Sequence, residues 1–232
     1  MKTSHLIIAS ALTLSPIASA SAAGFLDTES PSSLFNLGIR AGINTSTHTF
    51  DSRFFNEWNV NSWGTGLDAG VVFDINLRQY IALQPGFFFQ SRSGNYSYIQ
   101  DYKDPSDDIE RYTQLGNYRS YYFNIPIMVS LRFNLASNVK WLVEAGPYFQ
   151  LKLHSSDSEK IDVLVNNQDN SPILQTASAN TTDFGLKAGT GILVNNHYSF
   201  SIHYLAGARD VWKAPFDGGR NKSWTFTLGY NF

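Results

Sequence analysis

The sequence contains no cysteine, and only 16% of its 232 residues are charged. Without cysteine there can be no disulfide framework, no zinc–thiolate site and no anchoring through an acylated cysteine. The net charge of -2 gives no electrostatic basis for a nucleic-acid partner. After the first residues no apolar run approaches the roughly 18 residues that a membrane-spanning helix requires. The sequence therefore predicts no transmembrane helix.

The start of the chain has the features of a secretory signal peptide. Lys2 supplies a positive charge, residues 6–14 are apolar, and small residues at 18–22 form cleavage patterns. The apolar stretch is too short to span about 30 Å of hydrocarbon, which argues against a membrane anchor. We expect residues 1–22 to be removed, 23–33 to form a short N-terminal segment and 34–232 to form one folded domain.

Aromatic residues are abundant, at 15%, and together with aliphatic residues they occupy alternate positions in eight segments. In the first segment, for example, Phe35, Leu37 and Ile39 share a face. A period of two is the signature of a strand with two different faces. The eight segments are 35–44, 63–75, 81–91, 119–133, 141–153, 184–194, 198–208 and 223–232.

The opposite face of the same segments is polar and collects most of the glycines. Its long polar residues are Arg40, Asp68, Asp74, Gln84, Gln90, Arg132, Glu144, Lys152, Asp183, Lys187, His203 and Arg209. Glycine weakens an ordinary strand, but it suits a narrow interior where long side chains from opposite walls must fit. The connections alternate between long (45–62, 92–118, 154–183, 209–222) and short (76–80, 134–140, 195–197). An up-and-down sheet would gather the long loops at one end.

Three interpretations fit this alternation: an outer-membrane barrel, a soluble lipocalin-like barrel with an apolar lumen, and a secreted β-sandwich. The segments are longer than a usual strand of about 5–6 residues and long enough to cross a bilayer at a tilt. Short turns at one end and long loops at the other match the outer-membrane pattern. Large aromatics also gather near both ends of the segments, as in the two interfacial girdles of such barrels.

We therefore predict an all-β fold, an eight-stranded antiparallel up-and-down transmembrane β-barrel in the outer membrane, with 23–33 in the periplasm. Side chains just fill the interior of an eight-stranded barrel, so we expect no open pore. Pro85, Pro126 and Pro147 lie inside three of the segments. Proline cannot donate to a strand ladder, so we expect bulges or local breaks there.

Two stretches, "LQPGFFFQSRSG" (83–94) and "YYFNIPIMVSLRF" (121–133), resemble the PorT-like family of small outer-membrane β-barrel proteins. In that family a Gln-Pro-Gly strand is followed by an aromatic strand with Ile-Pro, and Gln84-Pro85-Gly86 and Ile125-Pro126 occupy these places. "DFGLKAGTGI" (183–192) is similar to a late strand of the family. The resemblance implies an eight-stranded barrel and, for some members, a part in protein secretion. It carries over no catalytic residue.

The loop histidines are the main candidates for chemistry. His48 with Asp51, or His154 with Ser155, Ser156 and Asp157, could contribute to hydrolysis of a lipid ester, because histidine can act as general base to a hydroxyl. A solvated loop histidine explains both positions more simply. We expect His203 to belong to the polar interior and His197 to lie in a tight turn.

The remaining loop features are acidic or aromatic. Asp104, Ser106, Asp108 and Glu110 alternate oxygens as in a calcium loop, but the glycine and distal glutamate of an EF-hand are missing. We expect a solvated loop there and assign no catalytic, cofactor or metal residues to the chain. Five loop aromatics could anchor a protein partner or rest on lipid headgroups: Phe54, Phe55, Trp58, Trp212 and Phe216.

The sequence thus favours a structural or partner-binding barrel that acts through its long extracellular loops. A lipid hydrolase or acyltransferase and a component of a secretion system are the alternatives. Outer-membrane lipids are expected around the barrel. The terminal strand, ending in Tyr230 and Phe232, resembles the signal that the barrel-assembly machinery reads.

Overall fold

The computed structural model describes residues 22–48, 60–61, 63–103, 109–155, 161–166, 172–213 and 218–232. One helical turn, α1 (Ala22–Phe25), precedes the strands. The strands are β1 (Phe35–His48), β2 (Val60–Asn61), β3 (Gly64–Arg78), β4 (Ile81–Lys103), β5 (Ile109–Ala136), β6 (Val139–Ser155), β7 (Ile161–Asn166), β8 (Pro172–Ala177), β9 (Thr182–Val194), β10 (Tyr198–Trp212) and β11 (Gly218–Asn231). No helix within these ranges is long and apolar enough to cross a membrane.

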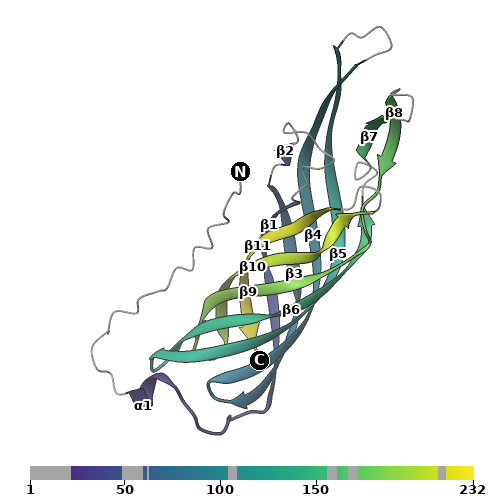
Figure 1. The fold of residues 1–232 in the computed structure, drawn as a ribbon. Helices are drawn as coiled ribbons and strands as arrows, with labels where there is room; N and C mark the ends of the chain where they lie inside the picture. The colour runs from purple at the N-terminus through teal and green to yellow at the C-terminus, as the bar shows by residue number, and fades with distance from the viewer. Residues whose placement is uncertain are drawn as a thin grey trace, which may run out of the picture.

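Eight strands, β1, β3, β4, β5, β6, β9, β10 and β11, form a closed ring in chain order (Figure 1). All pairings in the ring are antiparallel, and β1 closes it against β11 from Gly38↔Asn231 to His48↔Asn221. The alternating segment at the end of the chain therefore completes the barrel. The predicted eight-stranded up-and-down fold is confirmed.

Tight turns join the strands at one end of the barrel, which we call the turn end, and the longer connections lie at the opposite loop end. The connection between β9 and β10 is short because two residues are enough to reverse the chain. Asn195 and Asn196 have φ angles of 53° and 59°, and the His197 N–H donates to the Val194 carbonyl at 3.1 Å. Two consecutive left-handed residues are characteristic of the type I′ turn that matches strand twist. His197 is in the tight turn, as predicted.

The two faces of the wall divide as the sequence predicts. Leu67, Leu186 and Leu228 on the outer face are each 66% exposed, whereas Gln90 and Gln150 on the inner face are fully buried. The inner face holds the charged network, and the glycines make room for it. At Gly229, an added Cβ would collide with the Arg40 side chain, which lies across that glycine. The apolar face therefore points outward, and the lipocalin-like and sandwich interpretations are excluded.

One member of the predicted inner set, Arg209, lies elsewhere. The register between β10 and β11 shifts between Ala206 and Asp210. Arg209 falls in this irregular stretch and is exposed, with its guanidinium donating to the Thr182 hydroxyl. The prediction of a lumen position for Arg209 is wrong because the period of two is interrupted at the rim.

Aromatic clusters mark both ends of the outer wall. At the turn end Phe133 stacks on Phe25 at 5.0 Å and contacts Trp141 at 5.4 Å between ring centroids. At the loop end Tyr204 and Trp224 lie 4.8 Å apart. These two levels correspond to the predicted girdles, which in outer-membrane barrels lie at the membrane interfaces.

The three prolines interrupt the ladders but do not shift the register. Between β4 and β5, pairing stops after Pro85↔Ile127 and resumes at Phe88↔Asn124 in the same register. The β5–β6 pairing likewise stops at Pro126↔Tyr148 and resumes at Val129↔Ala145. The expectation of bulges or local breaks is confirmed in the form of breaks, since each proline removes a donor without adding a residue.

All four of the expected long loops contain strand residues. The segment 45–62 holds the end of β1 and the whole of β2. The segment 92–118 is mostly β4 and β5, which extend as a ribbon above the barrel (Figure 1). The segment 154–183 contains the β7–β8 hairpin, and β10 and β11 extend into 209–222. Apolar alternation predicts these strands too short, because it stops where the strands leave the membrane.

The N-terminal segment lies across the turn end of the barrel. The Asn134 side-chain amide donates to the Gly24 carbonyl at 3.2 Å. The Gln79 N–H donates to the Glu29 carbonyl at 3.3 Å, and the Asn76 N–H to the Leu34 carbonyl at 2.9 Å. These bonds hold residues 24–34 against the turns between β3 and β4 and between β5 and β6.

Candidate functional site

The barrel interior is filled by polar side chains that bond to one another in layers. Nearest the turn end, the Arg132 guanidinium on β5 donates to Asp74 Oδ2 and to Asn76 Oδ1, both on β3 and both at 2.9 Å. Gln84 on β4 donates to the other Asp74 oxygen at 2.6 Å. The carboxylate is therefore neutralised by one arginine and held by one amide, as a buried charge requires.

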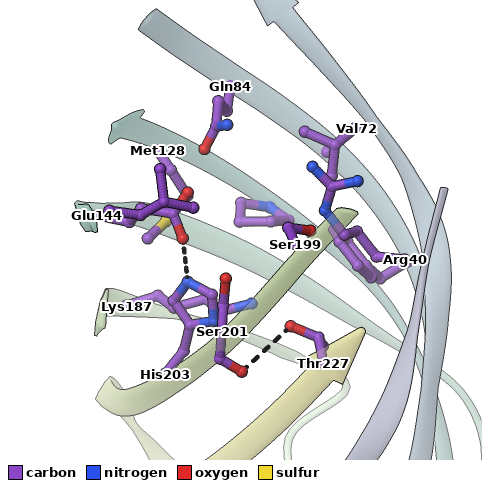
Figure 2. A pocket seen from close by; sticks show the side chains of 14 residues that line it. Arg40, Val72, Gln84, Met128, Glu144, Lys187, Ser199, Ser201, His203 and Thr227 are labelled. Atoms are coloured by element: carbon purple, nitrogen blue, oxygen red, sulfur yellow. Dashed lines mark hydrogen bonds and ion pairs between the residues drawn. The ribbon is translucent and has the colours of Figure 1, made fainter. Parts of the chain in front are cut away.

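The middle layer is centred on Glu144 of β6. His203 on β10 lies 2.8 Å from Glu144 Oε2, and the Ser130 hydroxyl on β5 donates to Oε1 at 3.2 Å. Figure 2 shows the Glu144–His203 contact, which joins β6 and β10, the two neighbours of β9 in the ring. The prediction that His203 belongs to the polar interior is confirmed.

A cavity of about 40 Å³ adjoins this layer. Its walls include Phe88, Arg40, Glu144, Lys187, Ser201 and His203. Figure 2 shows Arg40 and Glu144 reaching toward the cavity from opposite sides. Since one water needs roughly 10–15 Å³ on this measure, the cavity has room for only a few waters. The interior at this level is thus packed by side chains, as expected for eight strands.

Nearer the loop end, a third layer links four strands. Gln90 Nε2 on β4 donates to Asp68 on β3 at 2.9 Å, while Gln90 Oε1 accepts from Arg92 and from Gln150 on β6. The Arg92 guanidinium also lies 5.0 Å from the centre of the Tyr122 ring. Hydrogen bonds and a cation–π contact fix these long side chains in place.

The candidate catalytic histidines lie on opposite walls. His48 ends β1, is buried, and stacks on Tyr118 at 5.1 Å. His154 lies on β6, four strands away around the ring, where it is exposed and stacks on Tyr121 at 6.4 Å. Ser155 follows His154 at the end of β6. Asp51, Ser156 and Asp157 lie outside the described residues, so neither proposed set is brought together in the described part of the chain.

The other loop candidates fall largely outside the described ranges. These are Asp104, Ser106 and Asp108 of the acidic run, and the aromatics Phe54, Phe55, Trp58 and Phe216. Glu110 lies in β5 and Trp212 ends β10. Within the residues that the structure describes, no group of three or more histidine and carboxylate side chains could hold a metal ion.

The ribbon above the barrel is the main feature that sequence reasoning missed. The pairing of β5 with β6 ends at Ser120↔Ser155, but β4 and β5 continue together through eleven more pairs, from Ser93↔Arg119 to Lys103↔Ile109. At about 3.3 Å per residue, these pairs project roughly 35 Å beyond the wall. β2 pairs with the ribbon at Ser97 and Tyr96. Tyrosines at 96, 98 and 102 provided a sequence signal, because they keep the period of two.

Comparison with solved structures finds small outer-membrane proteins at low sequence identity. Neisserial surface protein A is 11% identical with a TM-score of 0.44, covering 84% of this chain and 97% of its own. Ail, the attachment invasion locus protein of Yersinia pestis, solved with the heparin analogue sucrose octasulfate, is 10% identical with a TM-score of 0.39, covering 86% and 100%. OprG from Pseudomonas aeruginosa is 12% identical with a TM-score of 0.38, covering 89% and 99%. No curated protein matches the sequence.

A protein-family model matches most of the chain and identifies its family. Residues 22–212 match the model described as "Outer membrane protein beta-barrel domain". This match covers most of the chain, including seven of the eight ring strands up to Trp212. Together with the closed ring and its apolar outer face, it places the protein in the outer membrane. The chain belongs to the family of outer membrane protein beta-barrel domains.

Proposed function

We propose that this protein is a non-enzymatic outer-membrane barrel that forms no open pore and binds a protein partner outside the cell. The observation that carries the proposal is the β4–β5 ribbon, which projects eleven residue pairs beyond the wall. In outer-membrane barrels the end with longer loops faces the outside of the cell. The ribbon would therefore be presented to molecules at the cell surface.

The edge of the ribbon offers backbone groups that can bind another protein. In the ribbon, residues 109–119 of β5 pair with β4 on one side. On their other side no described strand pairs with them. The outward edge of such a strand presents N–H and C=O groups that an extended segment of another protein can pair with. The filled interior supports the same proposal, since it leaves the loop end and the outer wall as the places to act.

Site-specific photo-crosslinking on intact cells tests the partner. A photoreactive residue at Thr113, where β5 has no partner among the described strands on the side away from β4, is compared with one at Asn138, in the turn between β5 and β6. We expect a discrete crosslinked adduct from Thr113 and none from Asn138. Equal adducts from both sites, or none from any ribbon position, would refute ribbon binding. A change in the cell's lipid masses that depends on the protein would instead indicate an enzyme.

Two narrower proposals concern identity and biogenesis. We propose that the protein is a PorT-like member, because Gln84-Pro85-Gly86 and Ile125-Pro126 match that group. Some members of the group take part in protein secretion. Comparing the secreted proteins of cells with and without the protein tests that role.

We also propose that residues 1–22 are a signal peptide and that the barrel-assembly machinery reads the terminal strand.

A further inference from the structure

Near the loop end, the backbone pairing between β3 and β4 stops before either strand ends. Pairing of β3 with β4 runs from Arg78↔Ile81 to Asp68↔Gln90, and no backbone pair between them is found past Asp68 in the described residues. Beyond that point β3 stays paired with β1 up to Ser46↔Gly64, and β4 stays paired with β5. This stretch, where β3 and β4 are no longer paired with each other although both remain part of the ring, is called the seam here.

Side chains replace the missing backbone bonds along this seam. The Leu67 N–H donates to the Ser91 hydroxyl at 2.8 Å, and the Ser93 hydroxyl donates to the Thr65 carbonyl at 2.6 Å. From the lumen, Asn44 Nδ2 donates to the carbonyls of Leu67 and Ser91 at 3.1 and 2.9 Å. An unsatisfied backbone group is costly in lipid. These three side chains bond four backbone groups along the seam, which lowers the cost of the interruption on a lipid-facing wall.

A groove opens on the outer face at this seam. It has a volume of about 550 Å³, within the range of roughly 300–1,000 Å³ that is usual for ligand sites. Ile43, Leu67 and Ala69 line one side, and Phe89 and Tyr121, whose rings stack at 5.7 Å, line the other. Ile43, Leu67 and Phe89 are more than half exposed, at 58, 66 and 51%. We call these five residues and their opening the seam groove.

The groove changes character toward the loop end. Its lining there includes Thr65, Ser93 and Arg119, and Ser93 pairs with Arg119 above the Ser91↔Tyr121 pair. The groove is therefore apolar toward the membrane and cationic at the rim. A guanidinium is well suited to phosphate, which it can hold with two parallel hydrogen bonds. An occupant should accordingly carry an acyl chain and a phosphate on the side of the outer leaflet.

We propose that the seam groove binds one acyl chain of a phosphorylated glycolipid of the outer leaflet, a lipopolysaccharide, with a phosphate of the lipid at Arg119. Ordinary lipid around a barrel contacts the whole wall, whereas this site has a defined hollow, with Arg119 exposed at its rim and Arg92 buried in its lining. The inference does not depend on the ribbon or its partner. It gives a lipid-binding function to the outer wall, which stays accessible although the lumen is filled.

Native mass spectrometry of the full chain, purified in detergent with added lipid A, tests the site. Ala69→Phe fills the groove, and Arg119→Ala removes its charge. The matched controls are Ala188→Phe, an exposed alanine on the outer face of β9, and Arg220→Ala, an exposed arginine on β11 at the loop end. Heat-modifiable gel mobility confirms that each variant is folded, and Arg119→Ala keeps the test valid if the larger side chain prevents folding.

The wild type is expected to retain one lipid A per chain, and each groove variant to retain it about tenfold less well, as for loss of a charged hydrogen bond or of the apolar site. The controls should behave as wild type. Dephosphorylated lipid A should bind the wild type as weakly as lipid A binds Arg119→Ala. Equal retention by groove variants and controls would overturn the proposal. Equal competition by phosphatidylglycerol would overturn the assignment to a glycolipid.

Discussion

Single residues hold the interior of the barrel through bonds between strands that are distant in sequence. Arg132 and Asp74 are 58 positions apart, and Glu144 and His203 are 59 positions apart. The sequence identifies such residues as lumen-facing because they occupy the polar positions of the alternating pattern. The pattern does not tell which of the five predicted inner lysines and arginines pairs with which carboxylate. That choice depends on the register and stagger of the closed ring. Arg209 shows the limit of phase alone, since one register shift removes it from the set.

Removing one member of the turn-end layer should destabilise the barrel strongly. Arg132→Ala leaves Asp74 as an uncompensated buried charge and Asn76 without its donor, so we expect a loss of about 3–5 kcal/mol in the free energy of unfolding. Urea unfolding of the protein in lipid vesicles measures it. Arg220→Ala is the control, since its ion pair with Asp210 is exposed and worth about 0–1 kcal/mol. A loss for Arg132→Ala no larger than for the control would contradict the account of the lumen.

The final residue should matter more for assembly than for stability. Phe232 is 64% exposed, and its backbone N–H bonds to Leu37 whatever its side chain. Phe232→Asp should therefore reduce outer-membrane levels in cells, because a terminal aromatic is lost from the proposed assembly signal. The purified variant should still refold in detergent, with heat-modifiable mobility like the wild type. Normal outer-membrane levels of Phe232→Asp would show that the terminal side chain is not read.

At the scale of elements, apolar alternation predicts strands only where one face meets lipid. It identified all eight ring strands and their three short turns, because there the outer face must be apolar and the inner face polar. It did not predict the ribbon, since above the membrane both faces meet water and the contrast between them disappears. The groove was also beyond sequence reasoning, because Asn44, Ser91 and Ser93 come together only once three strands are in register.

The β9–β10 turn offers a test of one element. Asn196 adopts a left-handed conformation, which a β-branched residue tolerates poorly. Asn196→Val should lower the free energy of unfolding by about 1–2 kcal/mol, whereas Asn196→Gly should not lower it, because glycine accepts positive φ freely. Denaturant unfolding of the two variants side by side provides the comparison. If valine and glycine had equal effects, the turn would not be of type I′.

The molecule as a whole is a closed wall with a filled interior and a projecting ribbon. Ring closure places every barrel strand between two partners, so backbone pairing closes the wall in the lipid except along the seam between β3 and β4. The charged layers then occupy the space that a larger barrel would leave to water. What this architecture leaves available is its outer wall, with the seam groove, and its loop end. Both proposed activities are located there for that reason.

The central claim, that the lumen is closed by its own side chains, is tested most directly by ion conductance. The purified, folded protein is inserted into a planar lipid bilayer and the current is recorded under applied voltage. The account predicts no stable conductance steps, because three layers of interlocked side chains and a cavity of only about 40 Å³ offer no continuous path. Reproducible long-lived open steps from the wild-type protein would contradict it.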